Sequence, residues 1–374
     1  MSPIKFLLFL SVVVLTFGAQ QLLAATTYGV GTCLPTLPSF STISDALAAS
    51  PAPETVEVCP GTYPEQIVIT KPVTLEGISS SSSAQVVIAV PKGGLHVNAF
   101  DAIGNPDAVQ VLVKDATGPV NISRITVDAA GNKITGNCSN DEVAVILGLF
   151  YQNSPGTVNH VTTRYQEGNG CGIGIQMEGG SSNPSVTVEN CDLHDFDFAG
   201  IEVESGSGSP DLTATITGND LSVVGSVPFY GIQAEGAVTM SVADNLVIGG
   251  PDGAIEVQAS GNGVVPTGSI TGNTLVGGQY GLALYGSAPI AVTSNRIFNE
   301  SQEGIVVDNS LAIVEDNNVT QAQVGIDFMC TVGSKVQSNT IFGMHIGVAN
   351  VPGAFTVTSN TFDNVTIIRS GSCP

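Results

Sequence analysis

The stretch Ala214-Thr215-Ile216-Thr217-Gly218-Asn219-Asp220-Leu221 decides the fold, because its pattern returns along the chain. Apolar and polar residues alternate, an asparagine follows, and another apolar residue stands two positions later. The asparagine recurs seven times, with spacings of 26, 28, 22, 22, 22 and 21 residues, at Asn219, Asn245, Asn273, Asn295, Asn317, Asn339 and Asn360. A period of this size predicts a solenoid, whose repeats bury their apolar faces only by stacking on one another.

Each repeat contains a second alternating segment that follows a glycine, as in Gly231-Ile232-Gln233-Ala234. Alternation with a period of two predicts strands, so each coil is expected to hold at least two of them. The glycines are expected to supply the bends of the coil. Cys191 and Ile125 occupy the asparagine position in fainter upstream repeats. An inward asparagine at each turn can donate to and accept from neighbouring coils, so a structural ladder of asparagines is predicted.

Two other solenoids share parts of this pattern. Leucine-rich repeats need leucine-dominated positions and a helical return, whereas the apolar positions here are mainly Val, Ile and Ala. Left-handed hexapeptide helices favour multiples of six, which spacings of 22, 26 and 28 do not respect. A parallel β-helix with three short sheets of stacked strands fits best.

The opening of the chain contains a short helix predicted within 40–47, a strand at 55–58, and the motifs Pro60-Gly61-Thr62-Tyr63-Pro64-Glu65 and Lys71-Pro72-Val73-Thr74-Leu75-Glu76-Gly77. With these motifs and the repeats, the chain resembles the right-handed parallel β-helix (pectin-lyase-like) superfamily. The resemblance implies an all-β, right-handed single-stranded parallel β-helix whose N-terminal segment, about residues 26–60, caps the stack with that helix. The catalytic motifs of pectin methylesterases and polygalacturonases are missing, and the chain has no Trp.

Charge and the first residues restrict the partners and the location. The chain carries 32 Asp+Glu and 10 Lys+Arg, a net charge of −22, which repels nucleic acid and anionic membranes. Residues 1–25 read as a signal peptide, because Lys5 is their only charge and the apolar run at 6–17 is shorter than the ~20 residues that span a bilayer. We therefore expect a secreted, periplasmic or cell-surface monomer with one domain at 26–374 and no membrane insertion.

Seven cysteines in an exported chain predict disulfides rather than a metal cluster. Cys33 and Cys59 flank the predicted cap, and Cys330 and Cys373 could pair at the other end. Cys138, Cys171 and Cys191 leave one thiol over. The sequence does not fix the pairing.

Outward positions of the second strands form two predicted columns, counted from Gly172, Gly200, Gly231 and Ala254. The first column reads Gly174, Glu202, Gln233, Glu256, Ala283, Val306 and Asp327. The second reads Gln176, Glu204, Glu235, Gln258, Tyr285, Asp308 and Met329. Stacked strands lie about 4.8 Å apart, so Glu204 and Glu235 should be neighbours, with Glu202 and Glu256 roughly 9.6 Å apart.

Paired carboxylates at about 5 to 9 Å suit glycoside hydrolysis, with one acting as the acid and the other as nucleophile or base. The predicted catalytic residues are Glu202, Glu204, Glu235 and Glu256. The predicted substrate-binding residues are Gln233, Gln258, Tyr230, Tyr285, His194 and Asp195. Carboxylates also suit Ca²⁺, the one cofactor considered, and no metal ligand is assigned.

The leading hypothesis is a protein that binds or processes a neutral or Ca²⁺-bridged polysaccharide or cell-surface glycan. Whether it is an enzyme, and then a hydrolase or a lyase, stays open. The alternative is a non-catalytic adhesion or structural module, because a chain this acidic carries solvated carboxylates on every outward face. Walls formed by residues 129–157 and 162–171 over the glutamates would favour an enzyme.

Overall fold

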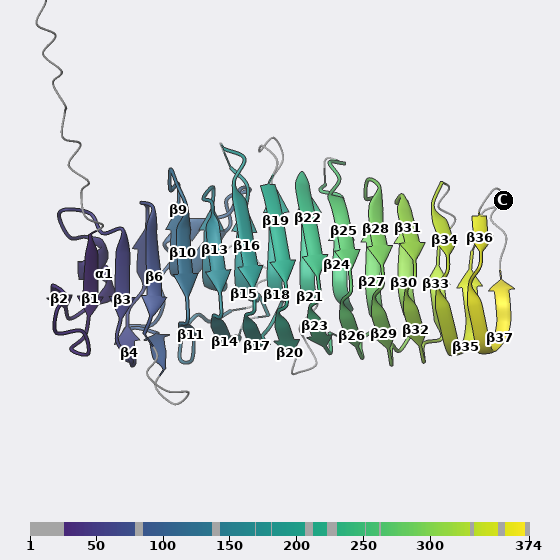
Figure 1. The fold of residues 1–374 in the computed structure, drawn as a ribbon, viewed down its shortest axis with the longest axis horizontal. Coiled ribbons are helices and arrows are strands. Elements are labelled where there is room, and N and C mark those ends of the chain that lie inside the picture. The colour runs from purple at the N-terminus through teal and green to yellow at the C-terminus, as the bar shows by residue number, and fades with distance from the viewer. Residues whose placement is uncertain are drawn as a thin grey trace, which may run out of the picture.

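The alternating segments form short parallel strands that stack into one long solenoid (Figure 1). The computed structural model describes residues 26–78, 85–136, 143–168, 170–180, 182–205, 212–222, 230–250, 252–261, 263–329, 333–350 and 356–370. The predicted fold class is confirmed, since the chain is an all-β, right-handed parallel β-helix. The predicted signal peptide, residues 1–25, lies outside the described residues.

A typical coil contributes one strand to each of three faces. The first face is a 14-stranded sheet, in the order β2 (Ser39–Phe40), β1 (Thr27–Val30), β3 (Thr55–Val58), β6 (Val73–Gly77), β10 (Val120–Ser123), β13 (Gly156–Asn159), β16 (Ser185–Glu189), β19 (Leu212–Thr217), β22 (Val238–Ala243), β25 (Thr267–Thr271), β28 (Ile290–Thr293), β31 (Ala312–Glu315), β34 (Lys335–Gln337) and β36 (Thr356–Thr358).

The second face follows the asparagine turn of each coil. It stacks β4 (Gly61–Pro64), β7 (Val86–Ala89), β11 (Thr126–Asp128), β14 (Thr162–Gln166), β17 (Asp192–Phe196), β20 (Asp220–Ser222), β23 (Leu246–Ile248), β26 (Thr274–Val276), β29 (Arg296–Phe298), β32 (Asn318–Thr320) and the first parts of β35 (Thr340–Ala349) and β37 (Thr361–Ser370).

The third face carries the outward glutamates. It stacks β5 (Ile67–Ile69), β9 (Pro106–Lys114), β12 (Val145–Gln152), β15 (Gly172–Glu178), β18 (Ala199–Ser205), β21 (Tyr230–Gly236), β24 (Gly253–Gln258), β27 (Tyr280–Tyr285), β30 (Glu303–Asp308), β33 (Val324–Asp327) and the second parts of β35 and β37. The short strand β8 (Ala99–Phe100) pairs antiparallel with β9.

The core lies inside the coils, where the inward residues of the three faces meet. In one coil Ile216 of β19, Leu221 of β20 and Ile232 of β21 are all completely buried in the same cluster. Burying a side chain of this size contributes about 1.5–3 kcal/mol, and each coil repeats the arrangement. The alternation of the sequence is thus the inside-outside alternation of each strand.

The predicted asparagine ladder is confirmed, and it runs along the turn between the first and second faces. Asn245 Nδ2 donates to Asn273 Oδ1 at 2.9 Å, and the Asn245 backbone N–H donates to the same oxygen at 3.0 Å. A further Nδ2 bond reaches the Ile216 carbonyl at 3.0 Å. The same pattern extends from Asn219 to Asn360. Cys191 stands at its beginning, where its backbone N–H donates to Asn219 Oδ1.

The glycines before the third-face strands serve packing rather than bending. Gly304 is not one of the glycines with a positive φ. A Cβ on it would lie 2.2 Å from Val319 Cγ1 and 2.7 Å from the Gly325 carbonyl oxygen. Gly231 and Gly281 meet Val247 and Ile297 in the same way. The prediction that these residues supply bends is therefore wrong, because they make room for the inward side chain of the second face.

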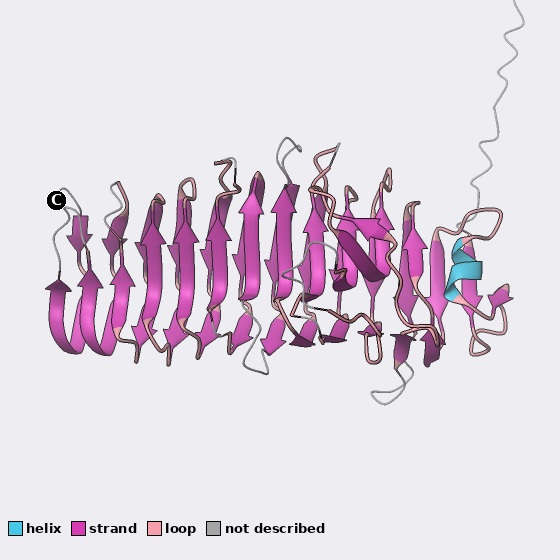
Figure 2. Ribbon diagram, turned by 180° about the vertical axis from the view of Figure 1, so that it is seen from behind, coloured by secondary structure: helices cyan, strands magenta, loops and turns pink. Residues whose placement is uncertain are grey.

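The N-terminal end carries the helix α1 (Ile43–Leu47), which contacts β1, β2, β3 and β5 (Figure 2). Thr42 caps it, as its hydroxyl accepts from Asp45 N at 3.1 Å. Glu65 holds the same end by accepting from Ile43 N at 2.8 Å. That α1 closes the end of the core stays a prediction. Across the described residues, no helix is long and apolar enough to cross a bilayer.

The cysteines agree with an oxidised protein. Cys33 and Cys59 form a disulfide, and Cys171 is also disulfide-bonded. Among the described cysteines Cys191 is free, and it is buried at the beginning of the ladder. Cys138, Cys330 and Cys373 lie outside the described residues, so the predicted bond at the C-terminal end stays a prediction.

The ladder can be tested with two adjacent asparagines. Asn317 accepts from Asn295 and donates to Asn339 and to the Val292 carbonyl, whereas Asn318 is exposed. Asn317→Ala should lower the free energy of unfolding by about 1–3 kcal/mol for each buried group left unpaired. Urea denaturation followed by circular dichroism measures this, with Asn318→Ala as the control. Equal midpoints for the two variants would contradict the structural role of the ladder.

The packing role of the glycines has its own matched pair. Gly304→Ala should destabilise the protein strongly, because the new Cβ overlaps Val319 and backbone. Gly261 has open space around its Cβ position and no positive φ, so Gly261→Ala should leave thermal stability unchanged or slightly raised. The two melting temperatures decide the matter, and a harmless Gly304→Ala would refute the packing explanation.

Candidate functional site on the third face

Four consecutive strands of the third face bring polar side chains into two outward columns. The first column reads Gln176, Glu202, Gln233 and Glu256 along β15, β18, β21 and β24. The second reads Glu178, Glu204, Glu235 and Gln258. We call these eight residues the carboxylate patch. The predicted adjacency of Glu204 and Glu235 is confirmed, and Gln233 separates Glu202 from Glu256 as expected.

The predicted beginning of both columns was wrong by two residues. Ile173 pairs with Ala199, so Gly174, and not Gly172, lies opposite Gly200. A Cβ on Gly174 would lie 2.9 Å from Leu193 Cδ2, just as one on Gly200 would meet Leu221. The packing site therefore selects the second glycine of Gly172-Ile173-Gly174. This shift places Gln176 beside Glu202 and adds Glu178 to the patch.

Side-chain amides and one phenol bind the carboxylates of the patch. Gln258 Nε2 donates to Glu235 Oε2 at 2.9 Å, and Gln233 Nε2 donates to Glu256 Oε1 at 3.4 Å. The Tyr230 hydroxyl also hydrogen-bonds Glu256. Three of the predicted substrate-binding side chains thus contact predicted catalytic ones. The fourth, Tyr285, is the register partner of Gln258 on β27.

The carboxyls in the middle of the patch are held away from water and close to one another. Burial, followed by the charges of Glu204 and Glu235, raises the pKa of Glu202 well above its usual value. Burial, with further contributions from Glu235 and Asp101, raises the pKa of Glu204 to about 7. Burial also raises the pKa of Glu235, although the hydrogen bond from Gln258 opposes the effect. At neutral pH the patch therefore holds both protonated and ionised carboxyls.

The ends of the patch are more deeply buried. Glu178 and Glu256 are only 3% and 7% exposed. Burial raises the pKa of each to about 7, against hydrogen bonds that lower it. Asp107 on β9 is 1% exposed, and burial together with Asp101 raises its pKa to about 8. A cluster of carboxyls with raised pKa values is characteristic of functional sites.

Sequence reasoning missed Asp101, Asp107, Gln152 and Glu178. Gln152 on β12 links the chain around β8 to the patch, because its Nε2 donates to the Phe100 carbonyl at 2.7 Å and to Glu178 Oε2 at 3.1 Å. Asp101 lies between β8 and β9, and its negative charge contributes to the raised pKa of Glu204. The repeat could have located Glu178 if the register had been counted from Gly174. Asp101 and Asp107 lie outside any repeat, so no pattern indicated them.

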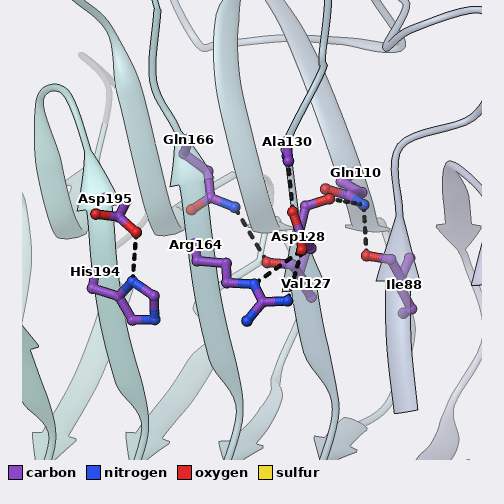
Figure 3. A network of polar contacts seen from close by, with 9 residues as sticks. All are labelled: Ile88, Gln110, Val127, Asp128, Ala130, Arg164, Gln166, His194 and Asp195. Carbon is purple, nitrogen blue, oxygen red and sulfur yellow. Dashed lines mark hydrogen bonds and ion pairs between the residues drawn. The ribbon is translucent and has the colours of Figure 1, made fainter. Parts of the chain in front are cut away.

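His194 and Asp195 do not join the patch. Both lie on β17 of the second face, where His194 Nδ1 and Asp195 Oδ2 are 2.8 Å apart (Figure 3). The register partner of His194 is Arg164, whose guanidinium pairs with Asp128 at 2.8 Å. The structure thus separates these two predicted substrate-binding residues from the glutamates.

The patch is limited along the solenoid. Beyond β24 the first column continues with Ala283 and Val306, which are buried apolar residues. Residues 129–157 and 162–171, the predicted walls, include β12, β13 and β14 of the solenoid itself. In the part of the chain that the structure describes, no three His, Cys, Asp or Glu side chains are grouped to hold a metal ion.

The family comparison agrees with this architecture. Residues 208–370 match the model of a family described as the right handed beta helix region. The right-handed parallel β-helix fold that the opening motifs implied is confirmed. No curated protein matches it in sequence.

Several solved structures share the fold. The A-module of mannuronan C-5 epimerase AlgE4 from Azotobacter vinelandii superposes with a TM-score of 0.57 at 14% identity, covering 88% of this chain and 93% of that one. GH136 lacto-N-biosidase from Eubacterium ramulus superposes with a TM-score of 0.63 at 12% identity, covering 92% of this chain and 68% of that one. The Streptococcus pneumoniae surface protein and adhesin PfbA superposes with a TM-score of 0.52 at 13% identity, covering 88% of this chain and 94% of that one. At such identities the likeness establishes the fold alone.

The raised pKa values predict how stability depends on pH. Glu178, Glu204 and Glu256 titrate at about 7 in the folded protein, against 4.5 for an ordinary glutamate. Between these values the folded state binds more protons than the unfolded one, so stability falls as the pH rises through this window. The urea midpoint should therefore drop from about pH 5 to about pH 8, and Glu204→Gln should flatten the curve. A midpoint that rises with pH would contradict the assigned pKa values.

Proposed function

We propose that the carboxylate patch binds and processes a polysaccharide. The observation that carries the proposal is the stacking of Glu202, Glu204, Glu235 and Glu256 on three adjacent strands in a partly desolvated setting. Relatives in fold include a mannuronan C-5 epimerase and a lacto-N-biosidase, whose names refer to saccharides. A long row of stacked coils also offers an extended chain ligand several successive subsites (Figure 1).

Glu204 and Glu235 have the arrangement that acid–base catalysis on a glycoside needs. Adjacent strands lie about 4.8 Å apart, close to the roughly 5 Å carboxyl separation of retaining glycosidases. Glu204, whose pKa is raised to about 7, can be protonated and donate to the leaving oxygen. Glu235 accepts a hydrogen bond from Gln258, which favours its ionised form as the nucleophile or base. Environments that move two carboxyls apart in pKa assign them these different roles.

A second candidate is a glycan-binding module without turnover. It is favoured by Ala283 and Val306, which interrupt the first polar column after β24. The adhesin PfbA, a surface protein, shares the fold. One measurement distinguishes the enzyme from the binding module, because only the enzyme releases reducing ends or altered sugars from the bound polymer.

We further propose that the protein is exported, acts as a monomer, and consists of one β-helical domain at 26–374 after a signal peptide at 1–25. Disulfides persist in oxidising compartments, and Cys33–Cys59 is one. Ca²⁺ remains the one cofactor to test. Polysaccharide screens with and without Ca²⁺, using a glycan array for binding and a reducing-sugar assay for turnover, address substrate and cofactor together.

The proposed roles predict the behaviour of a double variant. Glu204→Gln with Glu235→Gln should abolish turnover, by at least about 100-fold, because general acid–base groups contribute 10²–10⁴ in rate. The fold should remain, as glutamine keeps the shape of each side chain. Glu57→Gln with Glu315→Gln, on the first face, changes the net charge equally and should leave activity intact. Unchanged turnover in the patch variant would remove the assignment.

A further inference from the structure

Buried polar atoms in and beside the carboxylate patch have no hydrogen-bond donor among the described residues. Gln176 and Gln233 of the patch are 4% and 5% exposed and Asp107 on β9 is 1% exposed, and Gln176 Oε1, Gln233 Oε1 and Asp107 Oδ2 have no hydrogen-bond partner there. Gln233 lies in register between Glu202 and Glu256, and Gln176 lies beside Glu202. An unpaired buried polar atom costs free energy, so each is a place where a ligand can contribute a hydrogen bond. The two amide oxygens can only accept, so the ligand must supply donors to them.

The charges around these acceptors have the same sign. The acidic groups that face one another across the patch are Asp101, Asp107, Glu178, Glu202, Glu204, Glu235 and Glu256. Lys114 is the cation that acts on them, and it acts on Glu178 at one end. The ion pairs found among the described residues involve Arg124, Arg164 and His194, all of them elsewhere. A ligand that carries positive charge would relieve this repulsion, whereas a uronate would add to it.

We propose that the patch selects a glycan that carries a primary ammonium group, such as a polymer containing non-acetylated amino sugars. This inference deepens the proposed function and rests on it. An ammonium group provides three donors and no acceptor, which matches unpartnered amide and carboxylate oxygens. Charge-assisted hydrogen bonds are about twice as strong as neutral ones. A divalent metal fits less well, because no three acidic side chains of the described residues are grouped to hold one.

Gln233 gives the sharpest site for the ammonium group. Its amide nitrogen donates to Glu256, its amide oxygen has no partner, and its register neighbour on the other side is Glu202. Glu204 and Glu235 lie in the adjacent column, where the neighbouring glycosidic bond would meet the proposed acid and base. N-acetylation would replace one N–H with an acetyl group and remove another proton together with the charge, so a single N–H donor would remain.

The test compares three oligosaccharides of equal length by isothermal titration calorimetry: a glucosamine oligomer, its N-acetylated form and a uronic-acid oligomer. The glucosamine oligomer should bind at least about tenfold more tightly than the acetylated one, since a hydrogen bond to a charged group contributes that much. Its affinity should fall with added salt but not vanish, because a partly buried charge pair is screened incompletely. The uronate should not bind measurably.

Variants separate the site from the general negative charge of the protein. Gln233→Leu removes one acceptor without changing the charge and should weaken the glucosamine oligomer about tenfold. Glu57→Gln with Glu315→Gln should have no effect. Circular dichroism checks that each variant is folded, and Gln176→Leu, which removes the other unpartnered amide oxygen, replaces Gln233→Leu if that protein does not fold.

The remaining outcomes overturn the inference in distinguishable ways. If the acetylated oligomer binds equally well, and binding still depends on Glu204 and Glu235, the ammonium preference is wrong and the proposed function stands. If the first-face variant weakens the glucosamine oligomer as much as the patch variants do, binding is general charge attraction and the preference is again wrong. If no oligomer binds, the preference fails, and the glycan array then decides the proposed function on its own.

Discussion

The register between successive coils is the constraint on which the rest of the structure depends. Parallel strands repeat their hydrogen bonds without change from coil to coil, so a slip of one residue would turn every inward side chain outward. The asparagine ladder opposes such a slip, because each Oδ1 accepts from both the backbone and the side chain of the preceding asparagine, as between Asn245 and Asn273. These bonds are buried, and a shifted register would leave several of them unpaired.

The same register assembles the carboxylate patch. Glu204 and Glu235 are 31 residues apart in the sequence, yet they are direct partners because β18 and β21 pair in phase. Like charges placed this close destabilise the fold. The buried core and the asparagine ladder must therefore offset the charge repulsion within the patch, which destabilises the stacking of these coils. This is the usual relation between a rigid scaffold and a strained polar site.

Sequence patterns predicted the scaffold better than the site, for a physical reason. Every coil repeats the inward residues and the asparagine, so the signal accumulates along the chain. A Cβ on Gly174 would meet Leu193 of the second face, whereas one on Gly172 would meet the Gln166 backbone, and a local pattern carries no such information. Asp101 and Asp107 come from the chain around β8 and the beginning of β9, and their charges act on the patch. His194 lies on the second face, whereas the patch lies on the third. Tertiary contacts of single residues decided these cases.

The spacing of the asparagines connects the scaffold with the site. Downstream of Asn273 the coils take 21 or 22 residues, and there the outward column becomes Ala283 and Val306. The coils that begin at Asn219 and Asn245 take 26 and 28, and they supply Gln233, Glu235 and Glu256. Their additional residues lie in the sequence between β20 and β21 and between β24 and β25, before one third-face strand and after another. The asparagine ladder continues through these coils with the same hydrogen bonds. A β-helix can therefore lengthen the connections beside a site without disturbing its register, and the carboxylate patch lies where this chain has done so.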